Sequence, residues 1–401
     1  MKKKVIAVFT GNRSEYGLLL PILNSINNCS NLEFKLIVSG SHLENVYGKT
    51  ISEIKNDNIP IFKKIHINQK TSTLLNNVQS IGHGIIKISK ILYELKPDFM
   101  LVYGDRSETL SAAIASTQMV LPTIHIEGGD LTQGGSLDDN IRHAISKLSH
   151  LHLTTNLLAA KRLIQMGEES WRIKTVGLPS LDKIVREDFE NSENLIKKFK
   201  LNCKRTLIIF TQHSVASQHK KTKMQIMPSI EALKYFAAQG MQIIITYPNN
   251  DSGGNIIISE LKKLEAKKYK GIKIYKSLGS RVYHGLLSLR KKENFNVICV
   301  GNSSSGIKET PIFNCPTVNI GSRQDGRLRA ENVIDVEYDK KQIINAIKKC
   351  VYDAEFKKQC ANLKNPYYFG NVGQATVKFI NSIKINEKLL TKKNNSVIEF
   401  L

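Results

Sequence analysis

An acidic and a basic residue stand side by side after an apolar run in the segment VYGDRSETLSAA, residues 102–113. The run predicts a buried β-strand that ends at Gly104, so Asp105 and Arg106 are expected at its carboxyl end. A guanidinium binds an anion such as a phosphate, whereas a carboxylate repels it. The two side chains therefore suit different tasks: Arg106 to bind a phosphate and Asp105 to move a proton.

Two more acidic residues are expected near Asp105. Glu127 follows the next predicted strand in IHIEGGD, and Asp138 stands in the first turn of a helix after a glycine-rich loop. A single acid at a helix start is more often a cap than a catalyst. Carboxylates that converge repel one another, which raises the pKa of some and prepares one to accept and another to donate a proton. Structural charge networks have the same effect, so acid–base chemistry is one of two interpretations.

The segment VICVGNSSSGIKETP, residues 297–311, combines a buried strand, small polar residues and a helix start. Backbone N–H groups and the hydroxyls of Ser303 and Ser304 suit phosphate oxygens at a helix N-terminus. Glu309, expected in the first helical turn, would repel a phosphate at contact distance, so its carboxylate better matches the two hydroxyls of a ribose. Phosphate and ribose together predict a nucleotide; a plain serine-rich loop is the alternative.

Other predicted strands are followed by further candidates for anion and sugar binding. Arg13 lies in TGNRSEYG, where Ser14 is the expected helix cap, and Arg323 lies in NIGSRQDGR. His213 and Asn249 follow two strands of the second half, although a loop histidine and an ordinary turn explain them as well. The first strand lacks G-x-G-x-x-G, and the second, ending in LIVSGSH, lacks the acid that binds an NAD ribose. A nicotinamide dehydrogenase is therefore not expected.

The hydrophobic pattern predicts the scaffold that must position these residues. Short apolar runs alternate with helical patterns, which predicts parallel sheets with helices on both faces. The pattern pauses in the charged stretch Asp182–Lys204 and then restarts. We therefore expect an α/β protein with two doubly wound, Rossmann-like domains facing a central cleft.

Three parts are predicted along the chain. Residues 1–180 form an N-terminal domain with the catalytic acids, and residues 181–365 form a C-terminal nucleotide-binding domain. Residues 366–401 form a C-terminal helix and tail that pack back on the N-terminal domain, and the tail, LLTKKNNSVIEFL, is expected to be a loosely held end. The predicted strands are Val5–Phe9, Phe34–Ser39, Asp98–Tyr103, Thr123–Ile126, Leu151–Thr154, Lys174–Val176, Thr206–Phe210, Gln242–Thr246, Ile272–Tyr275, Asn296–Val300, Thr317–Ile320 and Val333–Val336.

Composition narrows the class of protein. Hydrophobic residues make up 41% and charged residues 23% of the chain, as in a globular protein, and no apolar run suits a membrane span or a secretory signal. A cytoplasmic location is therefore expected. Six scattered cysteines without a C-x-x-C pair favour free thiols over disulfides or a metal site. The net charge of +23 comes from lysine clusters without interleaved aromatic residues, which favours a solvated surface over nucleic acid or membrane binding.

Six motifs together resemble one enzyme family. GNRSEYG, VYGDRSE, IHIEGGD, DDNIRHAISKLSHLH, VGNSSSGIKE and NIGSRQDGR, in this order and spacing, are similar to the hydrolysing UDP-N-acetylglucosamine 2-epimerases of sialic acid biosynthesis. The resemblance runs from Val5 to the PYYFGNVGQA segment near Gly370. It implies two Rossmann-like domains in a GT-B-like architecture, no metal and no cofactor, a UDP-sugar substrate, and a homodimer or homotetramer.

The resemblance also implies a reaction and a role for each candidate. The family removes the C2 proton of the sugar and expels UDP, and water then adds to the unsaturated sugar with inversion at C2, giving N-acetylmannosamine and UDP. The implied catalytic acids are Asp105, Glu127 and Asp138. The residues implied to bind the UDP-sugar are Arg13, Arg106, His213, Asn249, Ser303, Ser304, Glu309 and Arg323.

Several alternatives stay open at the level of sequence. The same reaction on a UDP-2,4-diacetamido-2,4,6-trideoxy sugar of the legionaminic acid pathway differs only in contacts to C4 and C6. A non-hydrolysing epimerase would return a UDP-linked product, although the GDR and GGD-to-DD-x-I-R-H pattern favours the hydrolysing branch. A GT-B glycosyltransferase would need an acceptor site and fewer acids, and a nucleotide sensor would leave the acids unexplained. The loop GGDLTQGGSL is slightly longer than in animal relatives, which leaves its contacts and the sugar choice open.

Overall fold

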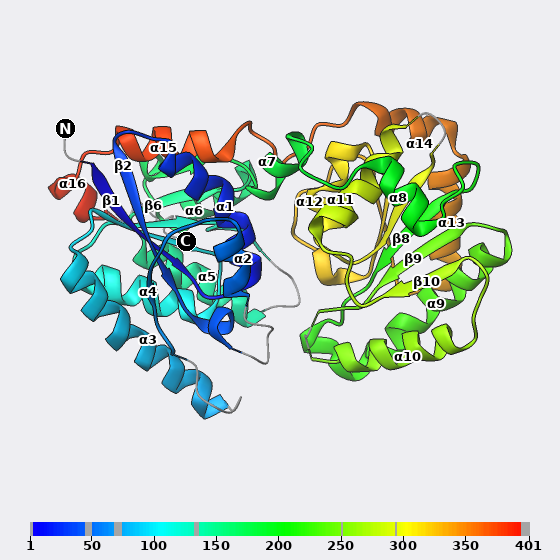
Figure 1. Cartoon of the computed structure of the whole chain (residues 1–401), viewed down its shortest axis with the longest axis horizontal. Coiled ribbons are helices and arrows are strands. Elements are labelled where there is room, and N and C mark those ends of the chain that lie inside the picture. The colour runs from blue at the N-terminus through cyan, green and yellow to red at the C-terminus, as the bar shows by residue number, and fades with distance from the viewer. Residues whose placement is uncertain are drawn as a thin grey trace, which may run out of the picture. The chain divides into compact units, whose positions relative to one another are not determined.

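The computed structural model describes residues 3–44, 50–67, 74–131, 136–249, 252–292 and 295–393. The chain folds into two compact units, each an α/β unit on a parallel sheet (Figure 1). The first contains Met1–Leu131, Leu137–Asp182 and Tyr367–Leu401, and the second contains Thr132–Ser136 and Lys183–Pro366. The chain therefore leaves the first unit after Asp182 and returns to it at Tyr367.

Seven parallel strands form the described sheet of the first unit, in the order β3-β2-β1-β4-β5-β6-β7. The order reverses between β1 and β4, and ligands of open α/β sheets bind beyond the carboxyl ends of the strands at such a switch point. The strands are β1 (Lys4–Thr10), β2 (Leu32–Val38), β3 (Ile61–Lys64), β4 (Phe99–Tyr103), β5 (Thr123–Ile126), β6 (Leu151–Thr154) and β7 (Ile173–Thr175).

Helices cover both faces of this sheet, so its central strands are apolar on both sides. On β1, Ile6 and Val8 pack in the core with α1 and α15, whereas Ala7 and Phe9 pack in the core with α3 and α4 (Figure 1). The helices are α1 (Arg13–Asn27), α2 (Ile51–Asn56), α3 (Leu74–Leu95), α4 (Ser107–Gln118), α5 (Ser136–Leu148), α6 (Leu157–Gln165), α7 (Ser180–Val185), α15 (Val372–Ser382) and α16 (Glu387–Leu390).

The second unit is built in the same way on six described parallel strands, in the order β10-β9-β8-β11-β12-β13. Its switch point lies between β8 and β11. The strands are β8 (Leu207–Thr211), β9 (Gln242–Thr246), β10 (Ile272–Tyr275), β11 (Val297–Gly301), β12 (Thr317–Ile320) and β13 (Val333–Val336). The helices are α8 (Ser192–Phe199), α9 (Thr222–Ala238), α10 (Gly254–Ala266), α11 (Ser280–Ser288), α12 (Ser305–Lys308), α13 (Lys340–Tyr352) and α14 (Ala354–Gln359).

The predicted fold class is confirmed, and every predicted strand is present with ends shifted by at most two residues. Strand β3, with the sequence IFKK, was not predicted. It is an edge strand on which Ile61 is half-buried and Phe62, Lys63 and Lys64 are exposed, so it carries no apolar run. The charged stretch between the two repeating patterns contains α8 and the end of α7.

The C-terminal segment is held to the first unit by Arg172, whose side chain is fully buried. The guanidinium of Arg172 donates at 2.8–2.9 Å to three backbone carbonyl oxygens of that segment, those of Lys388, Leu389 and Thr391. Lys392 in turn donates to the carbonyl oxygens of Lys147 and Ser149 at the end of α5, at 2.8 and 2.6 Å. The expectation of a loose tail is therefore wrong up to Lys393, and residues 394–401 lie outside the described residues.

We expect Arg172→Met to destabilise the first unit by about 3 kcal/mol, because the variant leaves several buried carbonyl oxygens without a donor. The only tryptophan of the chain, Trp171, stacks on this guanidinium with the ring centroid 4.3 Å from Cζ. Its fluorescence during urea unfolding therefore reports on this unit. The exposed Arg205→Met variant is the control and should change stability by less than about 0.5 kcal/mol. Equal unfolding midpoints for both variants would contradict the anchoring role.

Candidate active site

Two of the three acids predicted in the first unit lie at the carboxyl ends of neighbouring strands, and the third lies at the start of a helix. Asp105 sits in the turn after β4, and Glu127 directly follows β5, which pairs with β4. Asp138 lies in the first turn of α5, and all three side chains are half-buried. Glu127 has a φ of +67°, an uncommon conformation for a residue other than glycine, and such backbone strain is frequent at functional sites.

Arg142 on α5 binds one acid of this group, Asp105. Its guanidinium is only 4% exposed and forms ion pairs with Asp105 and Asp139, the latter at 3.1 Å. It also donates to the backbone carbonyl oxygen of Asp130 at 2.9 Å. A buried guanidinium needs partners of this kind, so Asp105 after β4, Asp130 after β5 and the first turns of α5 are tied to one side chain.

His125 and Asp130 are buried polar residues that bond the segments after β4 and β5 to their neighbours. The imidazole of His125 is fully buried and contacts the carbonyl oxygen of Gly104 at 2.8 Å and Ser146 Oγ at 3.0 Å. Burial lowers the pKa of His125 to about 3, so this residue is neutral and links β4 to α5. The Asp130 carboxylate is also buried and accepts bonds from Thr155 and Asn156 at 2.9 and 2.7 Å, which makes it a structural group.

Glu15 is a buried carboxyl group to which the sequence analysis gave no role. Asn12, not Ser14, caps α1, accepting a bond from the Glu15 N–H at 3.1 Å, and the Glu15 carboxylate accepts one from the Gly11 N–H at 2.9 Å. The Asn-x-x-Glu spacing of such a reciprocal cap is visible in the sequence and could have identified it. Burial, with the charge of Glu108, raises the pKa of Glu15 to about 7. Arg13 is the first residue of α1, and the positions of its side chain and that of Ser14 lie outside the described structure.

Arg106, predicted to bind a phosphate, is the N-cap residue of α4 and its side chain is exposed. It therefore follows Asp105 at the switch point between β1 and β4. The location agrees with an anion-binding role, because the first N–H groups of α4 are at the same place.

Asn302 organises the loops of the second unit, and it too was missed. It follows β11 and is fully buried. Its side chain accepts from the His213 N–H at 2.6 Å and donates to the His213 carbonyl oxygen at 2.9 Å. Its own carbonyl oxygen accepts from Gln324 at 2.8 Å and from Arg323 at 3.3 Å. Asn302 thus joins His213 after β8 and Arg323 after β12 to the loop after β11 that contains Ser303 and Ser304, here called the serine loop.

The His213 ring is oriented by a second bond. Its Nδ1 accepts from the backbone N–H of Asn249 at 3.1 Å, so the neutral ring carries its proton on Nε2 and can donate it to an anion. Asn249 itself is exposed. The residues predicted after β8 and β9 are therefore brought together in the structure.

The serine loop leads into a single helical turn. Ser303 and Ser304 are half-buried ahead of α12, which spans only Ser305–Lys308. Glu309 is the C-cap of this helix, so its predicted place in the first helical turn is wrong; the short helix ends before a 3₁₀ turn that begins at Thr310. The Glu309 carboxylate accepts from Ser305 Oγ at 2.6 Å and from His284 Nε2 at 3.0 Å.

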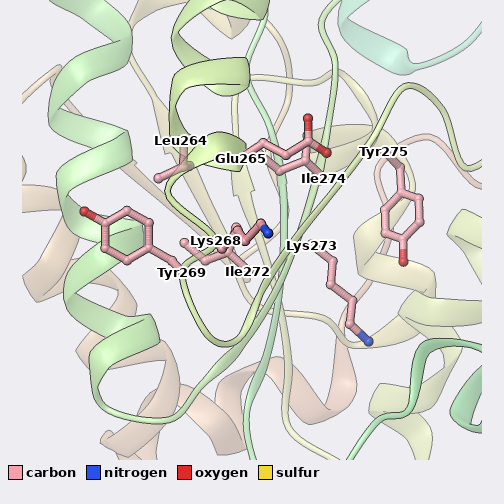
Figure 2. A pocket seen from close by; sticks show the side chains of 8 residues that line it. All are labelled: Leu264, Glu265, Lys268, Tyr269, Ile272, Lys273, Ile274 and Tyr275. Carbon is pink, nitrogen blue, oxygen red and sulfur yellow. The ribbon is translucent and has the colours of Figure 1, made fainter.

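Other features of the described residues do not form a competing site. They contain no group of three or more His, Cys, Asp or Glu side chains able to hold a metal ion, and none of their helices is both long and apolar enough to span a membrane. A pocket of about 270 Å³ lies beside β10 and the end of α10, and Figure 2 shows the side chains that line it. None of the predicted site residues lines it. Its lining consists of Leu264, Glu265, Lys268, Tyr269, Ile272, Lys273, Ile274 and Tyr275.

The raised pKa of Glu15 predicts a pH-dependent gain in stability for Glu15→Gln. Between pH 4.5 and about 7 the folded protein binds a proton here that the unfolded chain has released, so the wild-type free energy of unfolding falls as the pH rises. Relative to wild type, Glu15→Gln should therefore gain about 2 kcal/mol between pH 5 and pH 8. Urea unfolding followed by Trp171 fluorescence measures it. The exposed Glu94→Gln is the control, and an equal offset at both pH values for Glu15→Gln would contradict the prediction.

The chain is similar in sequence and in fold to known 2-epimerases. A protein of Legionella pneumophila named UDP-N,N'-diacetylbacillosamine 2-epimerase (hydrolyzing) is 31% identical over 394 residues, covering 98% of this chain and 100% of that protein. A Neisseria meningitidis UDP-N-acetylglucosamine 2-epimerase is 34% identical over 364 residues, covering 88% and 89%. Among solved structures, the crystal structure of a UDP-GlcNAc 2-epimerase from Neisseria meningitidis bound to UDP-GlcNAc has a TM-score of 0.77 at 18% identity, covering 95% of this chain and 100% of that one, which shows a shared fold.

The family itself is shown by the extent of the sequence match. A protein-family model described as UDP-N-acetylglucosamine 2-epimerase matches residues 24–383, which run from the end of α1 to the end of α15 and include every described strand except β1. The relatives above 30% identity cover most of the chain as well. The chain therefore belongs to the UDP-N-acetylglucosamine 2-epimerase family, whose members are enzymes.

Proposed function

We propose that the protein is a hydrolysing 2-epimerase that converts UDP-N-acetylglucosamine and water into N-acetylmannosamine and UDP. The observation that carries the proposal is a set of carboxylates in the first unit, in which Asp105 is paired with buried Arg142 and Asp138 lies on the same helix as that arginine. Glu127 adds a third carboxylate at the end of the adjacent strand. The proposed reaction removes a proton from C2 of the sugar and later returns one to C2 from the opposite face, so it can use more than one carboxylate. The word "hydrolyzing" in the Legionella relative's name supports this branch.

In the proposed first step, a carboxylate of the Asp105, Glu127 and Asp138 group removes the C2 proton. The electrons of the C2–H bond form a C1=C2 double bond, and the C1–O bond breaks with its electron pair leaving on UDP. In the second step, water supplies a hydroxyl to C1 while a proton is delivered to C2 from the opposite face. The product is the 2-epimer as a free sugar. Positioned carboxylates typically contribute about a hundredfold or more to each such transfer.

The C2 proton is only weakly acidic, so stabilisation of the departing UDP has to contribute much of the rate. We assign this role to His213 Nε2–H, to the loop of Ser303 and Ser304, and to Arg323, which the buried Asn302 ties together. Arg13, Arg106 and Asn249 are further proposed contacts, and Glu309 is placed at the ribose. A well-placed donor to a developing negative charge is worth about 3 kcal/mol.

A second substrate has specific support. The Legionella relative is named for UDP-N,N'-diacetylbacillosamine, a sugar with a second acetamido group, whereas the Neisseria relative is named for UDP-N-acetylglucosamine. Both sugars carry the same C1 and C2 groups. The assigned acids and the UDP contacts therefore suit either, and only contacts to C4 and C6 would separate them.

Incubation in deuterated water tests the reaction. With UDP-N-acetylglucosamine we expect free UDP and N-acetylmannosamine that carries deuterium at C2, detected by NMR and mass spectrometry. A deuterated product still linked to UDP would identify a non-hydrolysing epimerase. Turnover of the diacetamido sugar nucleotide alone would favour the second substrate. The absence of turnover with both sugar nucleotides would contradict the proposal.

The Asp105→Asn variant separates catalysis from binding. We expect kcat to fall by about a hundredfold or more, because the proton-transfer group is lost, while the Kd for UDP changes less than about threefold. Asp139→Asn is a matched control, since Asp139 pairs with the same arginine and has no assigned step. Trp171 fluorescence checks that both variants fold. Equal losses in both variants would remove the catalytic assignment of Asp105.

A further inference from the structure

Two side chains contact one oxygen of the Glu309 carboxylate and fix its orientation. Ser305 Oγ, one turn earlier, donates to its Oε2 at 2.6 Å, and His284 Nε2 contacts the same oxygen at 3.0 Å. Because a carboxylate only accepts hydrogen bonds, the His284 ring carries a proton on Nε2. The two donors come from different helices, α12 and α11, so the orientation of this carboxylate depends on tertiary packing.

His284 is itself fixed in place. Its side chain is 9% exposed. Its ring centroid lies 6.0 Å from that of Phe313 and 5.8 Å from that of Tyr283. The Tyr283 hydroxyl in turn lies 3.7 Å from Cys299 Sγ on β11, the strand that leads into the serine loop. The imidazole cannot turn away from Glu309 without losing these contacts.

We propose that His284 is a positioning residue for nucleotide binding, which together with Ser305 presents Glu309 to the ribose hydroxyls in one orientation. The inference rests on the proposed function, in which Glu309 meets the ribose of a UDP-sugar. A glutamate that is free to rotate loses side-chain entropy when it binds a ligand, whereas one that is already fixed does not. Without the two donors, Glu309 would still be present, but its bonds to the hydroxyls would form at a cost in affinity.

The alternative role for His284 is purely structural, namely to satisfy a half-buried carboxylate. The two roles differ in what they do to ligands that lack ribose hydroxyls. A structural loss weakens every nucleotide alike, whereas a positioning role acts only on ligands that Glu309 can bind through those hydroxyls. The pair UDP and 2′,3′-dideoxy-UDP separates them.

The experiment measures Kd for both nucleotides by calorimetry, in wild type and in variants of His284. We expect wild type to prefer UDP, and His284→Leu to weaken UDP by about tenfold while dideoxy-UDP binding stays within about twofold. His284→Gln keeps an N–H donor and should restore most of the preference. Ser305→Ala removes the other donor with little change in volume, so it tests the same idea if His284→Leu unfolds, and it should also weaken UDP selectively.

Three outcomes would overturn the inference. His284→Leu and Ser305→Ala could weaken both nucleotides equally, which identifies a structural role. Both variants could keep the full preference for UDP while Glu309→Gln abolishes it, which leaves the ribose contact intact but removes the positioning role. Wild type could bind both nucleotides equally, which removes Glu309 from the ribose. The reaction proposed above is judged separately, by turnover of UDP-N-acetylglucosamine in the wild-type protein.

Discussion

Polar side chains buried beneath the loops at the carboxyl ends of both sheets must each find hydrogen-bond partners, and this constraint orders the candidate site. A buried guanidinium or amide without partners costs more free energy than one hydrogen bond returns. The two terminal nitrogens of Arg142 find partners in the first unit in Asp105, Asp139 and the Asp130 carbonyl oxygen, and Asn302 finds them in the second in His213 and Gln324. These bonds fix side chains that the proposed function uses, and a side chain that is already fixed loses less entropy when a ligand binds.

The types of residue found in each unit follow from the proposed chemistry. Carboxylates can transfer protons, whereas a diphosphate is bound by hydrogen-bond donors and is repelled by acids at contact distance. The chain carries its three candidate acids after strands of the first sheet and the serine loop, His213 and Arg323 after strands of the second. Glu309 is the acidic exception in the second unit, and His284 and Ser305 hold it.

Much of the fold and part of the site were predictable from the sequence. Parallel strands covered on both faces appear as apolar runs between helical patterns, so twelve strands were located, and the residues placed after them do lie at the strand ends. The motifs also pointed to the family that the relatives show. Edge strand β3 was not predicted because only one of its four residues, Ile61, is partly buried, so the strand has no apolar run. Glu15 was not identified, although the Asn-x-x-Glu spacing of the helix cap is visible in the sequence.

The sequence by itself determined the alternation of elements, the residue types at strand ends and the family, because periodicity and motif spacing are local properties of the chain. Tertiary structure decided which side chains hold the site in place. Asn302 bonds a residue 89 positions away, and Arg172 binds a carbonyl oxygen 219 positions away. Such partners meet only when distant strands and helices have packed, since burial, which makes each of these bonds necessary, is a property of the folded chain and not of the local sequence.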